Sequence, residues 1–171
     1  MPRSTRAHKE RSPKSVTAAI ITMSDTRTPE TDDSGRIIRQ LLKSGGHKVV
    51  QHVICRDEPS ELNRELDQIL SRNVDTVIVN GGTGVSPRDI TIETISLRLE
   101  KKLDGFGELF RMLSYDEIGS AAMVSRAVAG TCGDVVIFCL PGSPDAVRLA
   151  LKKLVLPEIT HIVGLVKRSN E

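Results

Sequence analysis

The sequence predicts a single α/β domain with a mainly parallel sheet that helices cover on both faces. Two observations support this fold class. Segments that are apolar on both faces of a strand alternate along the chain with segments of helical periodicity. Strands of that kind occur in parallel sheets that are covered on both sides. In addition, the 171 residues are the length of one domain and are enough to bury a full core.

Four apolar segments are the predicted strands, and helices are expected between and after them. The strands are residues 16–23, 47–54, 76–79 and 134–140. The helices are residues 35–44, 57 or 60 to 70, 91–99, 105–126 in two pieces, 145–155, and a short segment after Pro157. The first helix has three candidate capping residues, Asp32, Asp33 and Ser34. Gly45-Gly46 ends it, because glycine adopts the left-handed conformation at low cost.

The net charge of +2 is unevenly distributed. The first fourteen residues hold five basic side chains and one acidic one. We expect residues 1–14 to form a solvated, disordered tail and residues 15–171 to form the domain. The alternative is that the tail binds nucleic acid or acidic lipid.

The composition excludes several classes of protein. Aromatic residues are only 2% of the chain and Trp is absent, so a surface for stacking bases is not expected, and neither is a nucleic-acid partner. Three scattered cysteines are too few for a disulfide framework, which favours a reducing, cytoplasmic location. No apolar segment reaches the roughly 18 residues of a membrane span, so no membrane association is expected, and the first residues lack the apolar centre of a signal peptide.

The loops that follow the predicted strands carry unusual chemistry. They are residues 24–27, 56–58, 80–89 and 141–144. Ligands of open parallel sheets bind at the carboxyl ends of the strands, so we expect these loops to share one cleft. That cleft would hold a glycine loop, a second turn of Gly142 and Ser143, and several carboxylates.

The loop Gly81-Gly82-Thr83-Gly84 predicts a phosphate site. Its glycines let the backbone approach a ligand closely and point successive N–H groups at an anion. It is neither a Walker loop, which needs a lysine after the last glycine, nor a dinucleotide fingerprint, because Pro87 stands where a third glycine is required. The alternative reading of the loop is a plain tight turn.

Asp57 and Asp89 each follow a strand and can both reach the cleft. Two nearby carboxylates repel unless a cation lies between them. Mg²⁺ prefers carboxylate oxygens and substrate phosphates, so a magnesium-bound nucleotide suits this pair. The alternative is that Asp57 caps a helix and that Asp89 forms an ion pair with Arg88 or Arg56.

Several motifs together resemble the MoaB/MogA family of molybdenum-cofactor biosynthesis proteins. The resemblance covers residues 16–161, and the central helical block and short C-terminus are more similar to MoaB than to MogA. The matching segments, in order, are Gly81-Gly82-Thr83-Gly84 followed by Asp89, then GFGELFR at 105–111, Ile118-Gly119, SRAVAG at 125–130, and LPGSP at 140–144.

The resemblance implies a three-layer αβα fold and a homo-oligomer, either a trimer or a hexamer. It implies molybdopterin and ATP as substrates, Mg²⁺ as cofactor, and adenylylation of molybdopterin with release of pyrophosphate. Other proteins of the pathway are implied partners. The catalytic and metal-binding acids of the family fall on Asp57 and Asp89. Phosphate and nucleotide binding falls on Gly81, Gly82, Thr83, Gly84, Pro141, Gly142 and Ser143, and weaker candidates for the pterin or nucleotide are Ser24, Asp25, Ser125 and Arg126.

Two other functions stay open at this point. The chain could be a non-catalytic module that binds or carries molybdopterin. It could instead be a nucleotide-processing enzyme of the competence-damage-inducible type, although such enzymes usually carry additional domain sequence. Finally, residues 147–166 are rich in large apolar residues, which predicts an oligomer interface on this segment unless the helix is buried on both sides within the subunit.

Overall fold

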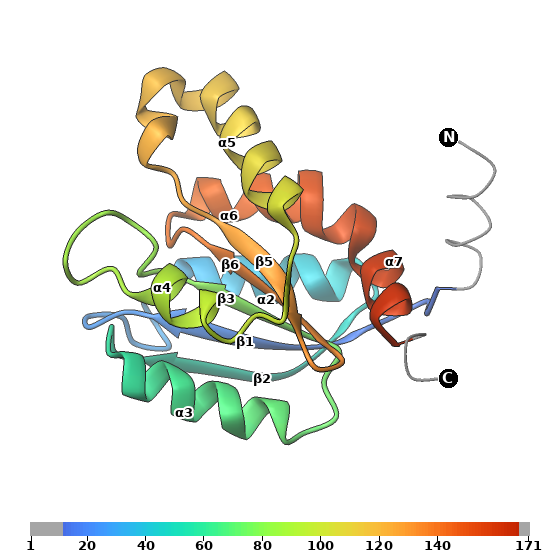
Figure 1. Ribbon diagram of the computed structural model, residues 1–171. Coiled ribbons are helices and arrows are strands. Elements are labelled where there is room, and N and C mark those ends of the chain that lie inside the picture. The colour runs from blue at the N-terminus through green and yellow to red at the C-terminus, as the bar shows by residue number, and fades with distance from the viewer. Residues whose placement is uncertain (1–11, 168–171) are drawn as a thin grey trace.

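A computed structural model describes residues 12–167 of the chain and shows a six-stranded sheet with helices on both faces (Figure 1). The sheet order is β2-β1-β3-β6-β5-β4. The strands are β1 Thr17–Met23, β2 Lys48–Cys55, β3 Thr76–Asn80, β4 Lys101–Lys102, β5 Val128–Cys132 and β6 Val135–Leu140. The four strands predicted from the sequence are β1, β2, β3 and β6, and these are the parallel ones.

One edge of the sheet is antiparallel and was not predicted. β5 pairs with β6 in a hairpin, and the two-residue β4 pairs with β5. The hairpin turns at Gly133, whose φ of +55° suits glycine. Small residues dominate β5, which reads VAGTC, so the segment lacks the apolar pattern by which the other strands are found.

The helices form the two outer layers of a three-layer fold. They are α2 Asp33–Ser44, α3 Pro59–Leu70, α4 Thr91–Ser96, α5 Asp104–Ile118, the 3-10 segment η1 Gly119–Val124, α6 Pro144–Ala150, the π-helical segment η2 Leu151–Val155, and α7 Leu156–Lys167. α2, α5, α6 and α7 pack on one face of the sheet, and α3 and α4 pack on the other (Figure 1). No helix of the described segment is long and apolar enough to cross a membrane.

The helix starts position the loops of the cleft. Asp32 caps α2 by accepting a hydrogen bond from the Gly35 N–H, as one of the three predicted caps. By contrast, the next two helices begin without a side-chain cap. α3 begins at Pro59, between the two starts considered for it, and proline suits the first helical position because it has no N–H to be satisfied. α4 begins at Thr91, as predicted.

The C-terminal segment differs from the sequence prediction. Residues 144–167 form one continuous helical stretch, with the π turn in its middle. Its largest apolar side chains are buried against β6, α2 and α5, so they do not form an exposed patch. Leu165, at 44%, is the only large apolar side chain of this stretch that is exposed. Packing between two neighbouring helices therefore accounts for the wide apolar surface of the segment within the subunit, which is the alternative that the sequence left open.

The chain begins its contacts with the domain inside the expected tail. An added Cβ on Gly164 of α7 would lie 3.1 Å from Ser12 Oγ and 3.2 Å from Pro13 Cδ, so residues 12 and 13 lie against this helix. The rest of the expected tail, residues 1–11, lies outside the described residues.

Candidate active site

The four parallel strands end at the same edge of the sheet, which brings their loops together. Met23 pairs with Cys55, and Asn80 pairs with Leu140. The Gly81 N–H donates to the Leu140 carbonyl at 3.1 Å, and a Cβ on Gly142 would lie 3.2 Å from Gly81 Cα. The loops after β1, β2, β3 and β6 therefore form one rim, as the sequence predicts.

At two positions, the glycine loop has a backbone conformation that glycine adopts far more readily than other residues. Gly81 and Gly82 have φ of +93° and +60°. A Cβ on Gly81 would lie 2.3 Å from the Met23 carbonyl oxygen, and one on Gly82 would lie 2.5 Å from Thr91 Oγ1 and 2.6 Å from Asp57 Oδ1. The loop is thus packed tightly against β1, α4 and Asp57, which leaves its backbone as the lining of the rim.

Arg126 braces this loop from the side of α4. Its Nε donates to the Thr83 carbonyl at 2.9 Å, and its Nη2 donates to the Gly84 carbonyl at 2.6 Å. Its Nη1 pairs with Glu93 at 2.5 Å, and this hydrogen bond lowers the pKa of Glu93. With all three nitrogens engaged, Arg126 orients the loop and is less free to touch a ligand than the sequence suggests. Its neighbour Ser125 is half-buried beside it.

Asp57 carries an acceptor that nothing in the described chain satisfies. Its Oδ1 is buried and has no hydrogen-bond partner, while its backbone N–H donates to Asp25 Oδ1 at 3.3 Å. Burial raises the pKa of Asp57, and the charges of Asp25 and Asp89 raise it further. A buried carboxylate oxygen that has no donor and lies near other acidic side chains is unfavourable by itself. It is well suited to bind a cation.

Asp89 lies within the loop that Asp57 faces. Its Oδ2 accepts the Ser86 N–H at 2.9 Å, and a Cβ on Gly84 would lie 2.7 Å from the same oxygen. The ion pairs considered for it are not formed, because Arg88 pairs instead with Asp25 at 2.6 Å and Glu58 at 2.9 Å. The hydrogen bond from Arg88 lowers the pKa of Asp25, so this third acid stays ionised and occupied.

The donor set fits a magnesium ion that is shared with a substrate. No three His, Cys, Asp or Glu side chains between residues 12 and 167 converge as the ligands of a metal ion. Mg²⁺ commonly takes only one or two carboxylates and completes its shell with phosphate oxygens and water. Asp57 and Asp89 are enough for that arrangement, and the unsatisfied oxygen of Asp57 is the observation that favours it.

The second glycine turn adjoins the first. Pro141 ends β6, Gly142 and Ser143 are exposed, and the Ser143 hydroxyl caps α6 by accepting the Ala146 N–H at 3.3 Å. The Gly142 carbonyl accepts the Ser34 hydroxyl at 2.7 Å, which turns it away from the rim toward α2. Exposed backbone beside Gly81 remains for a ligand at this turn.

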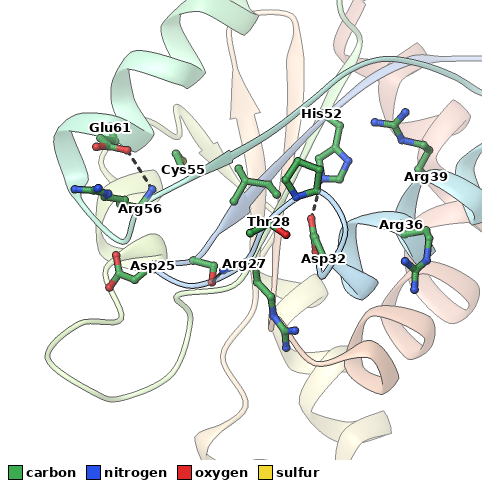
Figure 2. A pocket seen from close by; sticks show the side chains of 13 residues that line it. Asp25, Arg27, Thr28, Asp32, Arg36, Arg39, His52, Cys55, Arg56 and Glu61 are labelled. Carbon is green, nitrogen blue, oxygen red and sulfur yellow. Dashed lines mark hydrogen bonds and ion pairs between the residues drawn. The ribbon is translucent and has the colours of Figure 1, made fainter.

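A cavity of about 750 Å³ opens beside this rim, and sequence reasoning missed most of its lining (Figure 2). Ser24 and Asp25 are the two lining residues that the sequence suggested as ligand candidates, and Arg27 and Arg56 lie in loops that it predicted to share the cleft. Apart from Ser24 and Asp25, the lining residues come from the loop after β1, the first turns of α2, the edge strand β2, the loop that follows it and the first turn of α3. They are Arg27, Thr28, Pro29, Asp32, Arg36, Arg39, His52, Ile54, Cys55, Arg56 and Glu61. Finding them requires the register of α2 against β2, which one sequence does not supply.

A buried polar network forms the floor of this cavity. Asp32 is 2% exposed and accepts hydrogen bonds from the Thr22 hydroxyl at 2.6 Å and the Gly35 N–H at 2.8 Å, and it pairs with His52 Nε2 at 3.0 Å. Burial pushes the pKa of Asp32 upward, but the bonds from His52, Thr22 and Gly35 outweigh it and leave that pKa lowered. Thr22 Oγ1 also lies 3.0 Å from Asn80 Oδ1, directly before the glycine loop.

These features define an αβα protein with a glycine loop and an acidic rim at the carboxyl edge of its sheet. Residues 19–161 match the family model described as a probable molybdopterin binding domain. The Molybdenum cofactor biosynthesis protein B of Bacillus cereus is 52% identical over 157 residues, which are 91% of this chain and 93% of that protein.

Solved structures give the same result. A crystal structure of a Molybdenum cofactor biosynthesis protein B is 51% identical, has a TM-score of 0.89, and covers 91% of this chain and 98% of its own. The tungsten cofactor synthesizing protein MoaB from Pyrococcus furiosus is 36% identical, with a TM-score of 0.81 and coverage of 93% and 99%. The chain belongs to the MoaB/MogA family of molybdenum cofactor biosynthesis proteins.

Proposed function

We propose that the protein binds molybdopterin and adenylylates it with Mg-ATP, releasing pyrophosphate. The observation that carries this proposal is the buried Asp57 Oδ1, which has no partner in the described chain and lies against the glycine loop. A site that combines a phosphate-binding loop with an unsatisfied carboxylate oxygen suits a magnesium-bound polyphosphate.

In the proposed reaction a terminal phosphate oxygen of molybdopterin attacks the α-phosphorus of ATP. A new O–P bond forms to that phosphorus, and the bond to the bridging oxygen of pyrophosphate breaks. Asp57 and Asp89 would hold Mg²⁺, which would neutralise charge on the phosphates. The backbone N–H groups of Gly82 to Gly84, and those near Ser143, would bind phosphate oxygens. Such reactions depend mainly on positioning and on electrostatic stabilisation.

Arg88 and Arg126 support this arrangement from outside the reacting groups. Arg88 links the loop after β3 to Asp25 and Glu58, in the loops after β1 and β2. Arg126 fixes the carbonyls of Thr83 and Gly84 by hydrogen bonds, which would leave the N–H groups of the loop free to bind phosphate. Both arginines would therefore act as positioning residues.

The direct experiment incubates the protein with molybdopterin, ATP and Mg²⁺ and measures adenylyl-molybdopterin and pyrophosphate. Asp57→Asn is the matched control, because it keeps the shape of the side chain and removes its charge. Product that forms with the parent and not with this variant supports the proposal. Product that forms equally with both contradicts the role of Asp57.

A non-catalytic role is the second candidate, and one observation favours it. Arg88 already joins the loops after β1, β2 and β3 by pairing with Asp25 and Glu58, so the shape of the rim does not depend on a metal ion. A module that binds or carries molybdopterin would need the glycine loop without the metal. Intact molybdopterin binding in the absence of ATP turnover would distinguish this function from the first.

We further propose a homo-oligomer, a trimer or hexamer as the family resemblance implies, with α5 and η1 at its interface in place of the C-terminal helix. These two elements project from the body of the domain (Figure 1). Their exposed apolar side chains are Leu109, Met112, Tyr115, Ile118, Met123 and Val124. An apolar surface on one projecting element suits a second copy of this chain.

The free cysteines of the described chain, Cys55, Cys132 and Cys139, agree with a cytoplasmic location.

A further inference from the structure

The cavity beside the rim is separate from the proposed phosphate loop, although the two adjoin. Its lining contains neither Asp57 nor Asp89, and no residue of the glycine loop. It meets the rim at Ser24 and Asp25 and extends from there along α2 and β2. Its volume of about 750 Å³ is in the range of small-molecule sites. The proposed adenylyl transfer assigns no role to the end of the cavity that lies farthest from Ser24 and Asp25.

The acidic side chains of the lining already have hydrogen-bond donors, whereas some of its arginines have no acceptor among the described residues. The three carboxylates already have donors: Asp25 has Arg88, Asp32 has His52 and two further bonds, and Glu61 accepts the Arg56 N–H. The lining also contains four arginines, Arg27, Arg36, Arg39 and Arg56. Within residues 12–167 the guanidinium groups of Arg39 and Arg56 form no hydrogen bond or ion pair, so positive charge is left over.

The arginines at the far end are carried by rigid structure. Arg36 and Arg39 lie three residues apart on α2, so they share one face of the helix. Arg36 pairs with Asp33 at the surface, where both side chains are 54% exposed, and it can turn toward the cavity at little cost. Figure 2 shows these two arginines beside His52 and Asp32, with Arg27 completing that end. His52 is held by Asp32, and its side chain is only 12% exposed.

We propose that this cavity, which we call the arginine pocket, binds an oxyanion of a small molecule, either a phosphate or a pyrophosphate group, without a metal ion. Guanidinium groups bind such oxyanions through paired, charge-assisted hydrogen bonds. Arg36 and Arg39 are the principal ligands at the far end. The side chain of His52, which Asp32 holds in place, lines the pocket beside them. The anion comes either from free inorganic pyrophosphate or from a phosphate group of a larger ligand.

Titration calorimetry of the full chain with pyrophosphate, in EDTA and at low salt, tests the proposal. The titrations are run in a Gly82→Val background to remove anion binding at the glycine loop. The double variant Arg36→Gln/Arg39→Gln should bind pyrophosphate at least ~10-fold more weakly, because it loses two charge-assisted ligands. Arg72→Gln is the matched control. Arg72 is exposed and precedes β3, so it lies toward the amino-terminal end of the strands, opposite the rim at their carboxyl ends. It should bind like the Gly82→Val background.

Three outcomes decide the matter. Equal affinity in the double variant and the background overturns the arginine pocket, as does the absence of binding at millimolar pyrophosphate. An equal loss in Arg72→Gln shows general charge attraction and overturns it as well. If binding is lost selectively, competition identifies the source: displacement of pyrophosphate by molybdopterin or ATP assigns the pocket to a phosphate of that substrate, and no displacement assigns it to the free anion. Because no turnover is measured, these results are independent of adenylylation.

Discussion

A Cβ on Gly82 would lie 2.6 Å from Oδ1 of Asp57, the one carboxylate oxygen of the rim that is buried and unsatisfied. The loop that would bind phosphate is therefore packed directly against the acid that would hold the metal. The absence of a side chain at residue 82 is what allows this approach.

Gly82→Val should sharply reduce affinity for ATP and molybdopterin. The new side chain meets Asp57 and Thr91, and the φ of +60° is unfavourable for a β-branched residue. Gly46→Val is the matched control, because Gly46 has a φ of +81° and nothing within 4 Å of its added Cβ. It should lose stability and keep ligand affinity. Calorimetry that finds equal affinity in Gly82→Val and the parent would rule out the phosphate loop.

Arg126→Gln should weaken nucleotide binding by ~10-fold, since the loop loses the donors that orient two of its carbonyls. Arg126→Lys should restore part of this affinity. The control is Arg98→Gln, because Arg98 also makes several hydrogen bonds, to Asn63 and Asp67, and is similarly buried. Both Gln variants should lose comparable stability, and only the first should lose affinity. If the losses of affinity are equal, Arg126 has no special role at the loop.

Asp32→Asn should lower the free energy of unfolding by about 1–3 kcal/mol at neutral pH, the cost of weakening a buried charged hydrogen-bond network. The pKa of Asp32 is lowered in the folded state. The ionised form therefore contributes stability that is present above the unfolded pKa and is lost as pH falls through the folded pKa. The gap between variant and parent should close in acid. Denaturant melts from neutral to acidic pH measure it, with exposed Asp33→Asn as control; a gap that is constant with pH contradicts the network.

Met123→Glu should shift the protein toward monomers at micromolar concentration. Met123 is 82% exposed at the end of the projecting α5 and η1 segment, and a charge there would oppose burial against a second copy. Leu97→Glu is the control, because Leu97 is 89% exposed on a different element. Sedimentation velocity reports both. A parent that is already monomeric over that range would refute the oligomer.

Asp57→Asn and Asp89→Asn should each reduce turnover by at least ~10²-fold, the scale of losing one preorganised electrostatic group. Folding should be almost unchanged, because neither side chain supports the core. Steady-state kinetics with Mg-ATP and thermal melts check the two statements together. Near-normal turnover in either variant would remove that acid from the proposed mechanism.

The parallel sheet and its rim could be predicted from sequence because they depend on local patterns. Buried strands such as residues 135–140 are continuously apolar, and parallel strands bring their following loops to one edge. The β5 strand could not be found, since Ala129, Gly130 and Thr131 lack large apolar groups.

The remaining features depend on packing between distant segments. The arginine pocket requires Arg36 and Arg39 of α2 to lie beside His52 of β2, a register that no local pattern contains. The C-terminal helix has apolar residues around much of its circumference, which is equally consistent with an interface or with neighbours inside the subunit. Here α2 and α5 are those neighbours.

The central claim is adenylyl transfer, and ATP labelled at its α-phosphate tests it most directly. The protein is incubated with this ATP, molybdopterin and Mg²⁺, and the label on molybdopterin is counted against the pyrophosphate released. The proposed function predicts equal amounts of labelled molybdopterin and pyrophosphate from the parent, and a loss of both from Asp57→Asn. Molybdopterin that binds to the parent but acquires no label would contradict adenylylation.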